Sequence, residues 1–193
     1  MILNDVDITT GIINDGLVTI PHYPYEAYPE MYEPSIQPAS YDLTLSKSFK
    51  RMRKVDTEFM DFGTPIEYED VPYDDYKNRG VIIQPGEFLL GASKEVLTLP
   101  CDISGLVTGR SSIGRAGLIV ETAGWIDPNY TGSITLEFVN CSPNPIRLIE
   151  GIRIAQIVFM KMTDKCAVPY QGKYQHQLEA TVSRIHLDKE VHK

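Results

Sequence analysis

The segment GRSSIGR at residues 109–115 concentrates side chains that bind anions. It carries two arginines, Arg110 and Arg115, and two serines, Ser111 and Ser112. Guanidinium forks, hydroxyl donors and the backbone N–H groups of glycine and serine together form a cradle for a small anion. The spacing GxxxxGK[ST] does not occur, so this is not a Walker loop. A polar crossing from a strand into a turn is the alternative interpretation.

Glu137 is the second candidate for chemistry, in the predicted strand GSITLEFVN at residues 132–140. Alternation along the strand places Glu137 on the face opposite to Leu136 and Phe138. Burial in mid-strand would desolvate the carboxylate, raise its pKa and suit it to proton transfer near neutral pH. An exposed strand glutamate is the commoner case, by about two to one.

Trp125 and Asp127 lie in WIDPNYTG, which we predict to be a hairpin-like connection. An aspartate before proline often caps a turn, and a tryptophan more often fills a core than stacks on a ligand. Neither Trp125 nor Asp127 therefore indicates a ligand site on its own.

Zinc-dependent base deamination is excluded by the motifs that are missing. That chemistry needs H-x-E together with P-C-x-x-C, so that three ligands hold a metal that activates water. None of the four histidines begins H-x-E, and Pro100-Cys101 lacks the second cysteine of the motif. The serine nucleophile motif G-x-S-x-G is also missing.

The pattern beyond residue 81 predicts an all-β barrel or jelly roll, because short apolar stretches alternate with turn residues. These stretches are residues 81–93, 95–100, 103–109, 117–124, 132–140, 145–151 and 152–160. A further strand is predicted at 36–45, with Tyr41, Leu43 and Leu45 on one face.

A short N-terminal amphipathic helix is predicted at residues 4–16. Asn4 or Asp5 can cap it and Gly16 can end it. Its apolar positions are Val6, Ile8, Ile12 and Ile13.

Four other segments have composition that favours surface positions. Residues 21–34 alternate proline and tyrosine and predict an ordered loop laid over the surface. The basic run at 50–54 predicts a solvated edge, and the acidic residues 56–75 predict a solvated loop or edge hairpin. The polar tail after Asp164 is expected to be mobile.

Length and charge bound the class of protein. The 193 residues favour one domain, 1–193, and the net charge of −8 argues against general nucleic-acid affinity. The three cysteines lack CxxC spacing and predict reduced, mostly buried thiols of a cytoplasmic protein. No signal peptide is expected, and no apolar run is long enough to span a membrane.

These motifs, taken in order, resemble the dCTP deaminase branch of the trimeric dUTPase superfamily. The resemblance spans most of the chain and rests on QPASYDLTL, QPGEFLLG, GRSSIGR, TAGWID, ITLE, GIRIAQIVF and PYQGKYQHQ. It implies a mainly β, dUTPase-like barrel or jelly roll with a short N-terminal helix. It also implies a homotrimer with active sites between subunits, each closed by a mobile tail at residues 165–193.

The resemblance further implies zinc-free chemistry. Glu137 would deprotonate the water that attacks C4 of cytosine, and Ser111, Arg115 and the Ala123 backbone would position the water and the base. Asp127 would meet the deoxyribose 3′-hydroxyl and the hydrolytic water. Catalytic roles fall on Glu137, Asp127, Ser111 and Arg115. Substrate contacts fall on Arg110, Ser111, Ser112, Ile113, Gly114, Arg115, Ala123, Asp127, Thr135, Leu136, Glu137, Gln156, Tyr170, Lys173 and Gln177.

The product depends on Gly124 and Trp125, which stand where enterobacterial deaminases carry His-Arg in a longer segment. The leading expectation is a bifunctional enzyme that converts dCTP to dUMP, ammonia and diphosphate. Mg²⁺ would be held through the triphosphate, without direct protein ligands. The alternatives are a deaminase that releases dUTP, a dUTPase alone, or a catalytically silent nucleotide sensor. dTTP is a candidate inhibitor, and neither nucleic acid nor a membrane is expected as a partner.

Overall fold

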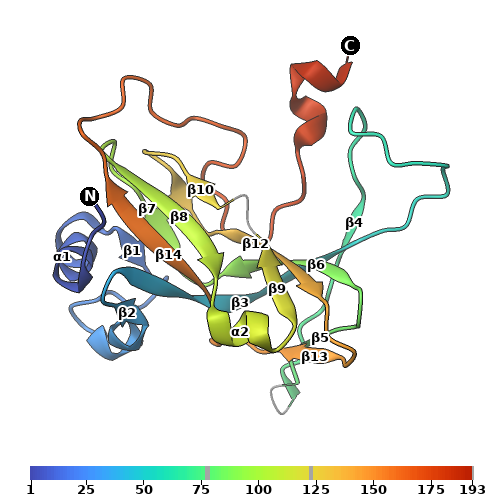
Figure 1. Ribbon diagram of the computed structural model, residues 1–193, viewed down its shortest axis with the longest axis horizontal. Helices are drawn as coiled ribbons and strands as arrows, with labels where there is room; N and C mark the ends of the chain where they lie inside the picture. Colours follow the sequence, from blue (N-terminus) through green and yellow to red (C-terminus); the bar gives the residue numbers. More distant parts are fainter. Residues whose placement is uncertain (77–78, 122–123, 193) are drawn as a thin grey trace.

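The computed structural model describes residues 1–76, 79–121 and 124–192, and this part of the chain is mainly β (Figure 1). The strands are β1 Val18–Thr19, β2 Ile36–Gln37, β3 Ser40–Met52, β4 Tyr68–Asp70, β5 Val81–Ile83, β6 Phe88–Ser93, β7 Val96–Thr98, β8 Ile103–Gly109, β9 Leu118–Glu121, β10 Trp125–Ile126, β11 Thr131–Gly132, β12 Thr135–Asn140, β13 Ile146–Leu148 and β14 Arg153–Lys161. The helices are α1 Asp5–Asp15 and α2 Ser111–Arg115, with 3₁₀ turns η1 Pro29–Met31, η2 Glu33–Ser35, η4 Ile185–Leu187 and η5 Lys189–His192.

The largest sheet has the order β10-β8-β14-β3-β6-β12-β9, and neighbouring strands along it are antiparallel. The long strand β3 connects its two halves. Residues near Tyr41 pair with β14, and residues from Leu45 onward pair with β6. A register shift on β14 in the first pairing and another on β3 in the second bend these strands, so the sheet curls around the core. Two small sheets, β1-β7-β11 and β5-β13, complete the fold.

The strand predicted at 36–45 exists, and it continues as β3 to Met52. Tyr41, Leu43 and Leu45 are fully buried, as their alternation predicted. The prediction of a solvated edge at 50–54 is wrong for its first residues, because Lys50 and Arg51 lie between β4 and β6. Their charges are neutralised locally, since Lys50 pairs with Asp70 on β4 and Arg51 pairs with Glu87.

Helix α1 confirms the capping signals read from the sequence. Asn4 accepts a hydrogen bond from the Asp7 N–H at 2.8 Å, and Gly16 ends the helix in the left-handed region at φ 62°. Ile8 and Ile12 are buried because they lie one turn apart on the same face. Val6 and Ile13 were also expected at apolar positions, but their side chains are exposed.

The Tyr/Pro segment is an ordered loop, as predicted, and Tyr32 holds it in place. The Tyr32 hydroxyl accepts a hydrogen bond from the Ile20 N–H at 2.8 Å and donates to the Tyr23 carbonyl at 2.6 Å. The ring itself is buried in the core. The acidic stretch 56–75 contains β4, which pairs with β3 at the sheet edge, as the edge-hairpin prediction required.

Two expectations from the sequence are corrected by the fold. WIDPNYTG does not form a hairpin, because β10 pairs with β8 while β11 pairs with β7 in a different sheet. The cysteines are free but not mostly buried, since Cys141 is exposed and Cys101 and Cys166 are half-buried. In the described ranges, every helix is too short or too polar to cross a membrane.

Candidate functional site

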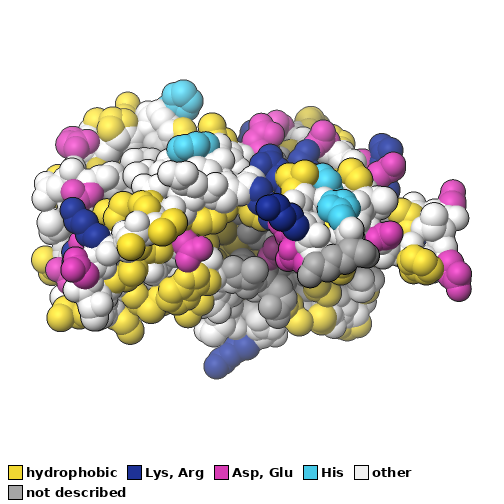
Figure 2. Space-filling view, turned by 90° about the horizontal axis from the view of Figure 1, so that it is seen from above, with side chains coloured by type: hydrophobic (Ala, Val, Ile, Leu, Met, Phe, Trp, Pro, Cys, Tyr) yellow, Lys and Arg dark blue, Asp and Glu magenta, His cyan; other side chains and the backbone are white. Residues whose placement is uncertain are grey.

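A pocket of about 390 Å³ opens on the outer face of the sheet around β12. Figure 2 looks onto this face, where hydrophobic side chains border a hollow near the middle of the molecule. The pocket is lined by strands β4 and β6, Val107 on β8, the segment from Gly124 to Tyr130, Ile134 with strand β12, and the tail. The members that the sequence analysis had singled out are Gly124, Trp125, Asp127, Thr135, Glu137, Tyr170 and Gln177.

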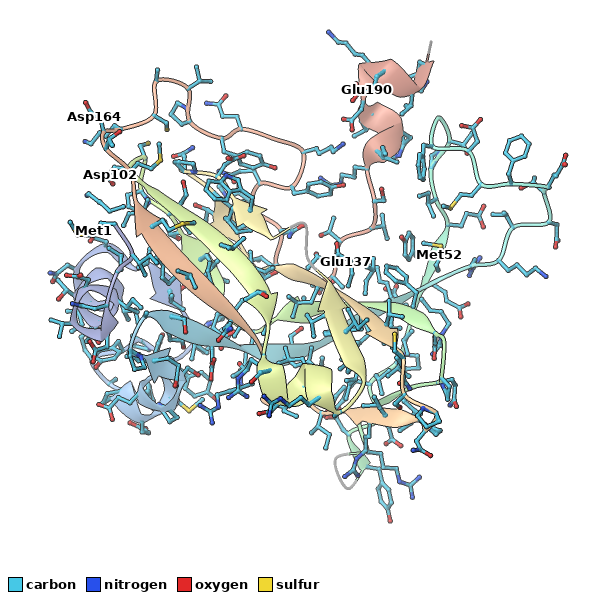
Figure 3. All side chains as sticks on the ribbon, viewed as in Figure 1. Met1, Met52, Asp102, Glu137, Asp164 and Glu190 are labelled. Atoms are coloured by element: carbon cyan, nitrogen blue, oxygen red, sulfur yellow. The ribbon has the colours of Figure 1, made fainter. Side chains whose placement is uncertain are left out.

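Strand β12 directs Glu137 into this pocket. Leu136 and Phe138 are fully buried in the core, so the half-buried Glu137 lies on the opposite face, as alternation predicted. Its cross-strand partner on β6 is Leu90, which also lines the pocket. Figure 3 labels Glu137 near the centre of the molecule.

The surroundings of Glu137 are largely apolar and aromatic. Tyr68, Phe88 and Leu90 line the same pocket. Burial raises the pKa of the Tyr68 phenol, and the negative charge of Glu137 adds to that shift. Such a wall lowers the local polarity around a carboxylate, which suits Glu137 to proton transfer. The sequence did not indicate Tyr68, because only strand pairing brings β4 to this face.

The tail lies over the pocket and is held there by its backbone. The Thr181 N–H donates to Thr135 Oγ1 at 3.0 Å, and the Gln177 carbonyl accepts from the Ser133 N–H at 2.8 Å. Ala180 is buried, with its N–H donating to Ser48 Oγ at 3.0 Å. Of the tail residues expected to contact substrate, Gln177 lines the pocket. Lys173 instead forms an ion pair with Asp188 at 2.6 Å.

The turn after β10 fixes Asp127 at the pocket. The Trp125 indole Nε1 donates to Asp127 Oδ1 at 3.0 Å, and the Asp127 carbonyl accepts from the Tyr130 N–H at 3.2 Å. Asn129 adopts the left-handed region at φ 72°, which asparagine tolerates better than most residues. Its side-chain amide donates to the Tyr170 carbonyl at 3.0 Å, so this turn also binds the tail.

Within GRSSIGR, residues Ser111–Arg115 form a five-residue helix, α2, which neither the predicted anion cradle nor the alternative turn crossing had indicated. Ser111, Ser112 and Arg115 are exposed on it, and Arg110 precedes it at the end of β8. Neither α2 nor Arg110 lines the Glu137 pocket of the same chain. Figure 1 shows α2 at the lower end of the sheet, away from the tail.

Arg110 is positioned by a buried carboxylate that the sequence did not reveal. Asp42 on β3 is only 2% exposed, and its Oδ2 lies 3.2 Å from both Arg110 Nε and an Arg153 guanidinium nitrogen. Burial raises the pKa of Asp42, and the two arginines counteract that shift. Gln156 is the cross-strand partner of Asp42 on β14, so it belongs to this second group.

The sequence-predicted residues therefore fall into two separate groups in one chain. Glu137 and Asp127 share the pocket, while Arg110, Gln156 and helix α2 belong to the opposite group. The Leu136 side chain faces the core, which leaves only its backbone for a ligand. Ala123 lies outside the described residues.

Comparison with known proteins places this arrangement in a family. Residues 22–162 match the family model described as dCTP deaminase-like. The chain is 40% identical over 190 residues to "dCTP deaminase, dUMP-forming" of Persephonella marina, covering 98% of this chain and 100% of that protein. It is 34% identical over 203 residues to "dCTP deaminase" of Halorubrum lacusprofundi, covering 100% of this chain and 95% of that protein.

A solved structure supports the same conclusion. The 2′-deoxycytidine 5′-triphosphate deaminase from Agrobacterium tumefaciens is 26% identical and superposes with a TM-score of 0.59. The match covers 82% of this chain and 47% of that chain, about half of its length. The protein belongs to the dCTP deaminase-like family.

Proposed function

We propose that this protein converts dCTP and two waters to dUMP, ammonia and diphosphate. The observation that carries the proposal is the opening of Glu137 and Asp127 into one pocket, with Asp127 held by Trp125. One carboxylate serves deamination and the other serves hydrolysis. The near full-length relative named as dUMP-forming supports both steps in one enzyme.

In the deamination step, Glu137 takes a proton from water as the water oxygen attacks C4 of cytosine. The same carboxyl group then returns the proton to the amino group, which leaves as ammonia. The apolar wall of Tyr68, Phe88 and Leu90 excludes bulk water from the carboxylate. No zinc ligand is required, because the protein supplies the base that activates water.

In the hydrolysis step, Asp127 orients the second water toward the α-phosphorus. The Trp125 hydrogen bond restrains the carboxylate, so its free oxygen has one preferred direction. Arg110, contributed together with helix α2 by a neighbouring subunit, stabilises the charge that develops on the phosphate oxygens, and Asp42 of that subunit holds its guanidinium in place. The products of this step are dUMP and diphosphate.

A homotrimer brings the two groups of residues together. In one chain, helix α2 lies outside the Glu137 pocket, yet both groups are needed for one substrate. We place α2 of a neighbouring subunit on the open side of the pocket, where Ser111 and Arg115 would orient the base and its water. This arrangement gives three composite sites in a dUTPase-like β-barrel trimer.

Mg²⁺ fits the proposed site through the triphosphate. The buried carboxylate nearest Arg110 is Asp42, and its Oδ2 already contacts two arginines. Phosphate oxygens and water are therefore the ligands left for the ion. When bound, Mg²⁺ would supply charge neutralisation on the phosphates, and Arg110 and Gln156 would bind phosphate oxygens.

The experiment that tests the proposal is product analysis of dCTP with Mg²⁺, separating dUTP, dUMP, ammonia and diphosphate. Equal release of ammonia, dUMP and diphosphate supports it. Accumulated dUTP would instead assign a deaminase only. Hydrolysis of dUTP without any reaction of dCTP would assign a dUTPase, and binding without turnover would assign a nucleotide sensor.

A further inference from the structure

Two of the three cysteines, distant in the sequence, meet at the root of the tail. The Cys166 N–H donates to the Cys101 carbonyl at 2.9 Å. Burial raises the pKa of the Cys166 thiol, and the neighbouring Cys101 side chain raises it further. Both residues are free thiols and half-buried. Their backbones therefore meet, which brings the two thiol side chains close to each other.

The contact joins two elements that are otherwise held firmly in register. Cys101 precedes β8, and Cys166 follows β14, where the tail begins. Next to them, the Met162 N–H donates to the Asp102 carbonyl at 2.8 Å, and Lys161 pairs with Asp102 at 2.5 Å. Figure 3 labels Asp102 and Asp164 at this end of the sheet.

The same place lies close to the proposed hydrolytic turn. Beyond Cys166, the Tyr170 N–H donates to the Pro128 carbonyl at 3.0 Å, which brings the tail against the residue that follows Asp127. The charge of Asp127 acts on the Cys166 thiol and contributes to a raised pKa, whose main cause is burial. A covalent link at Cys166 would therefore fix the tail directly beside Asp127.

We propose that Cys101 and Cys166 form a reversible disulfide that fixes the root of the tail to the sheet. The oxidant is a small-molecule disulfide such as oxidised glutathione. One protein thiolate attacks it to give a mixed disulfide and one glutathione thiolate, and the second protein thiolate then displaces the other glutathione. The two cysteine sulfurs lose two electrons in total, the glutathione disulfide gains them, and two glutathione thiols are released.

Cys141 provides an internal control, because it is exposed and has neither cysteine as a neighbour in sequence. The native protein is incubated with oxidised glutathione and analysed by intact mass and by peptide mapping without reduction. We expect one glutathione adduct at Cys141 and an internal link between the peptides that contain Cys101 and Cys166. The matched variant Cys141→Ser should form the same internal link without an adduct.

The single variants make the outcome decisive. In Cys101→Ser or Cys166→Ser the remaining partner should carry glutathione, because no second thiol can displace it.

Amide hydrogen exchange of residues 165–176 should slow at least several-fold in oxidised protein, with a rise in thermal midpoint of about 5 °C. Adducts or free thiols at both Cys101 and Cys166 in oxidised native protein would overturn the proposal. A disulfide between two chains, or an unchanged rate of amide hydrogen exchange at residues 165–176, would also overturn the proposal. None of these readouts depends on nucleotide turnover.

Discussion

The indole Nε1 of Trp125 and the carboxylate of Asp127 are hydrogen-bonded at 3.0 Å, with a single residue between them in the chain. Although the Trp125 ring is more than half exposed, its donor is therefore committed to Asp127. The tryptophan is thus a positioning residue at the pocket rather than part of the core. We propose that Trp125 acts on the hydrolysis of the triphosphate through this hydrogen bond to Asp127.

Replacing Trp125 with phenylalanine should separate the two reactions. The ring is kept, but the donor that orients Asp127 is lost, so diphosphate release should fall by about 10-fold while ammonia release changes little. dUTP should then accumulate from dCTP. The double variant Gly124→His with Trp125→Arg should show a larger loss, because the arginine adds a charge that competes for Asp127. Equal losses of ammonia and diphosphate in Trp125→Phe would contradict this role.

Replacing Glu137 with glutamine should abolish deamination with little change in the fold. The amide has the same shape but cannot accept a proton from water, so ammonia release should drop by about 10²–10⁴-fold. Nucleotide binding, measured by calorimetry with dCTP, should persist. Glu69→Gln on the exposed part of β4 is the matched control and should retain activity. A folded Glu137→Gln protein that still releases ammonia rapidly would remove this residue from the mechanism.

Mixed trimers should recover activity that neither variant has alone. Glu137→Gln and Arg115→Ala chains, co-refolded in equal amounts, pair an intact Glu137 with an intact Arg115 from a neighbour in about one quarter of sites. Specific activity should return to about that fraction of the native value. If both residues act from the same chain, the mixture stays inactive, and the composite site fails.

Glu95 should make stability depend on pH. It is fully buried, with its two carboxyl oxygens 2.8 Å from the Thr44 N and 2.6 Å from Thr44 Oγ1. Burial raises its pKa from 4.5 to about 7. The folded protein therefore holds this proton more tightly than the unfolded chain does. The favourable contribution of this bound proton to the free energy of unfolding is complete below pH 4.5 and is lost as the pH rises through about 7.

The matched variant Glu95→Gln keeps the shape without titrating: its amide oxygen can still accept from the Thr44 N–H, and its NH2 group can donate to Thr44 Oγ1. It should gain up to about 3 kcal/mol over the native protein above neutral pH, and the difference should shrink toward acid pH. Free energies of unfolding in urea at about pH 5 and about pH 8 measure this. A difference independent of pH would show that Glu95 does not titrate in this range.

The fold was predictable wherever local patterns and the surrounding structure agree. The Asn4 and Gly16 caps and the alternation around Glu137 depend on neighbouring residues only, and both are confirmed. Helix α2 was missed because glycine at position 114 disfavours a helix, yet the segment makes one short turn between β8 and β9. WIDPNYTG was misread because its two strands belong to different sheets, which no local signal reveals.

The candidate site was only partly predictable for the same reason. Its motifs could be read from the sequence, but Tyr68, Asp42 and the Cys101–Cys166 contact depend on pairing between distant segments. The tail carries no periodic apolar pattern, and hydrogen bonds from its main chain and from the Gln175 and Gln177 side chains hold it over the pocket. Whether it opens during turnover stays a prediction.

Isotope dilution tests direct formation of dUMP most directly. The enzyme is given radiolabelled dCTP and Mg²⁺ together with a large excess of unlabelled dUTP, and the label in early dUMP is measured. If both steps occur in one site and dUTP is not released between them, early dUMP should have the same specific radioactivity as the dCTP. The unlabelled dUTP should only slow the reaction by competing for the site. Label that appears first in free dUTP, and reaches dUMP only after dilution by the unlabelled pool, would contradict the account.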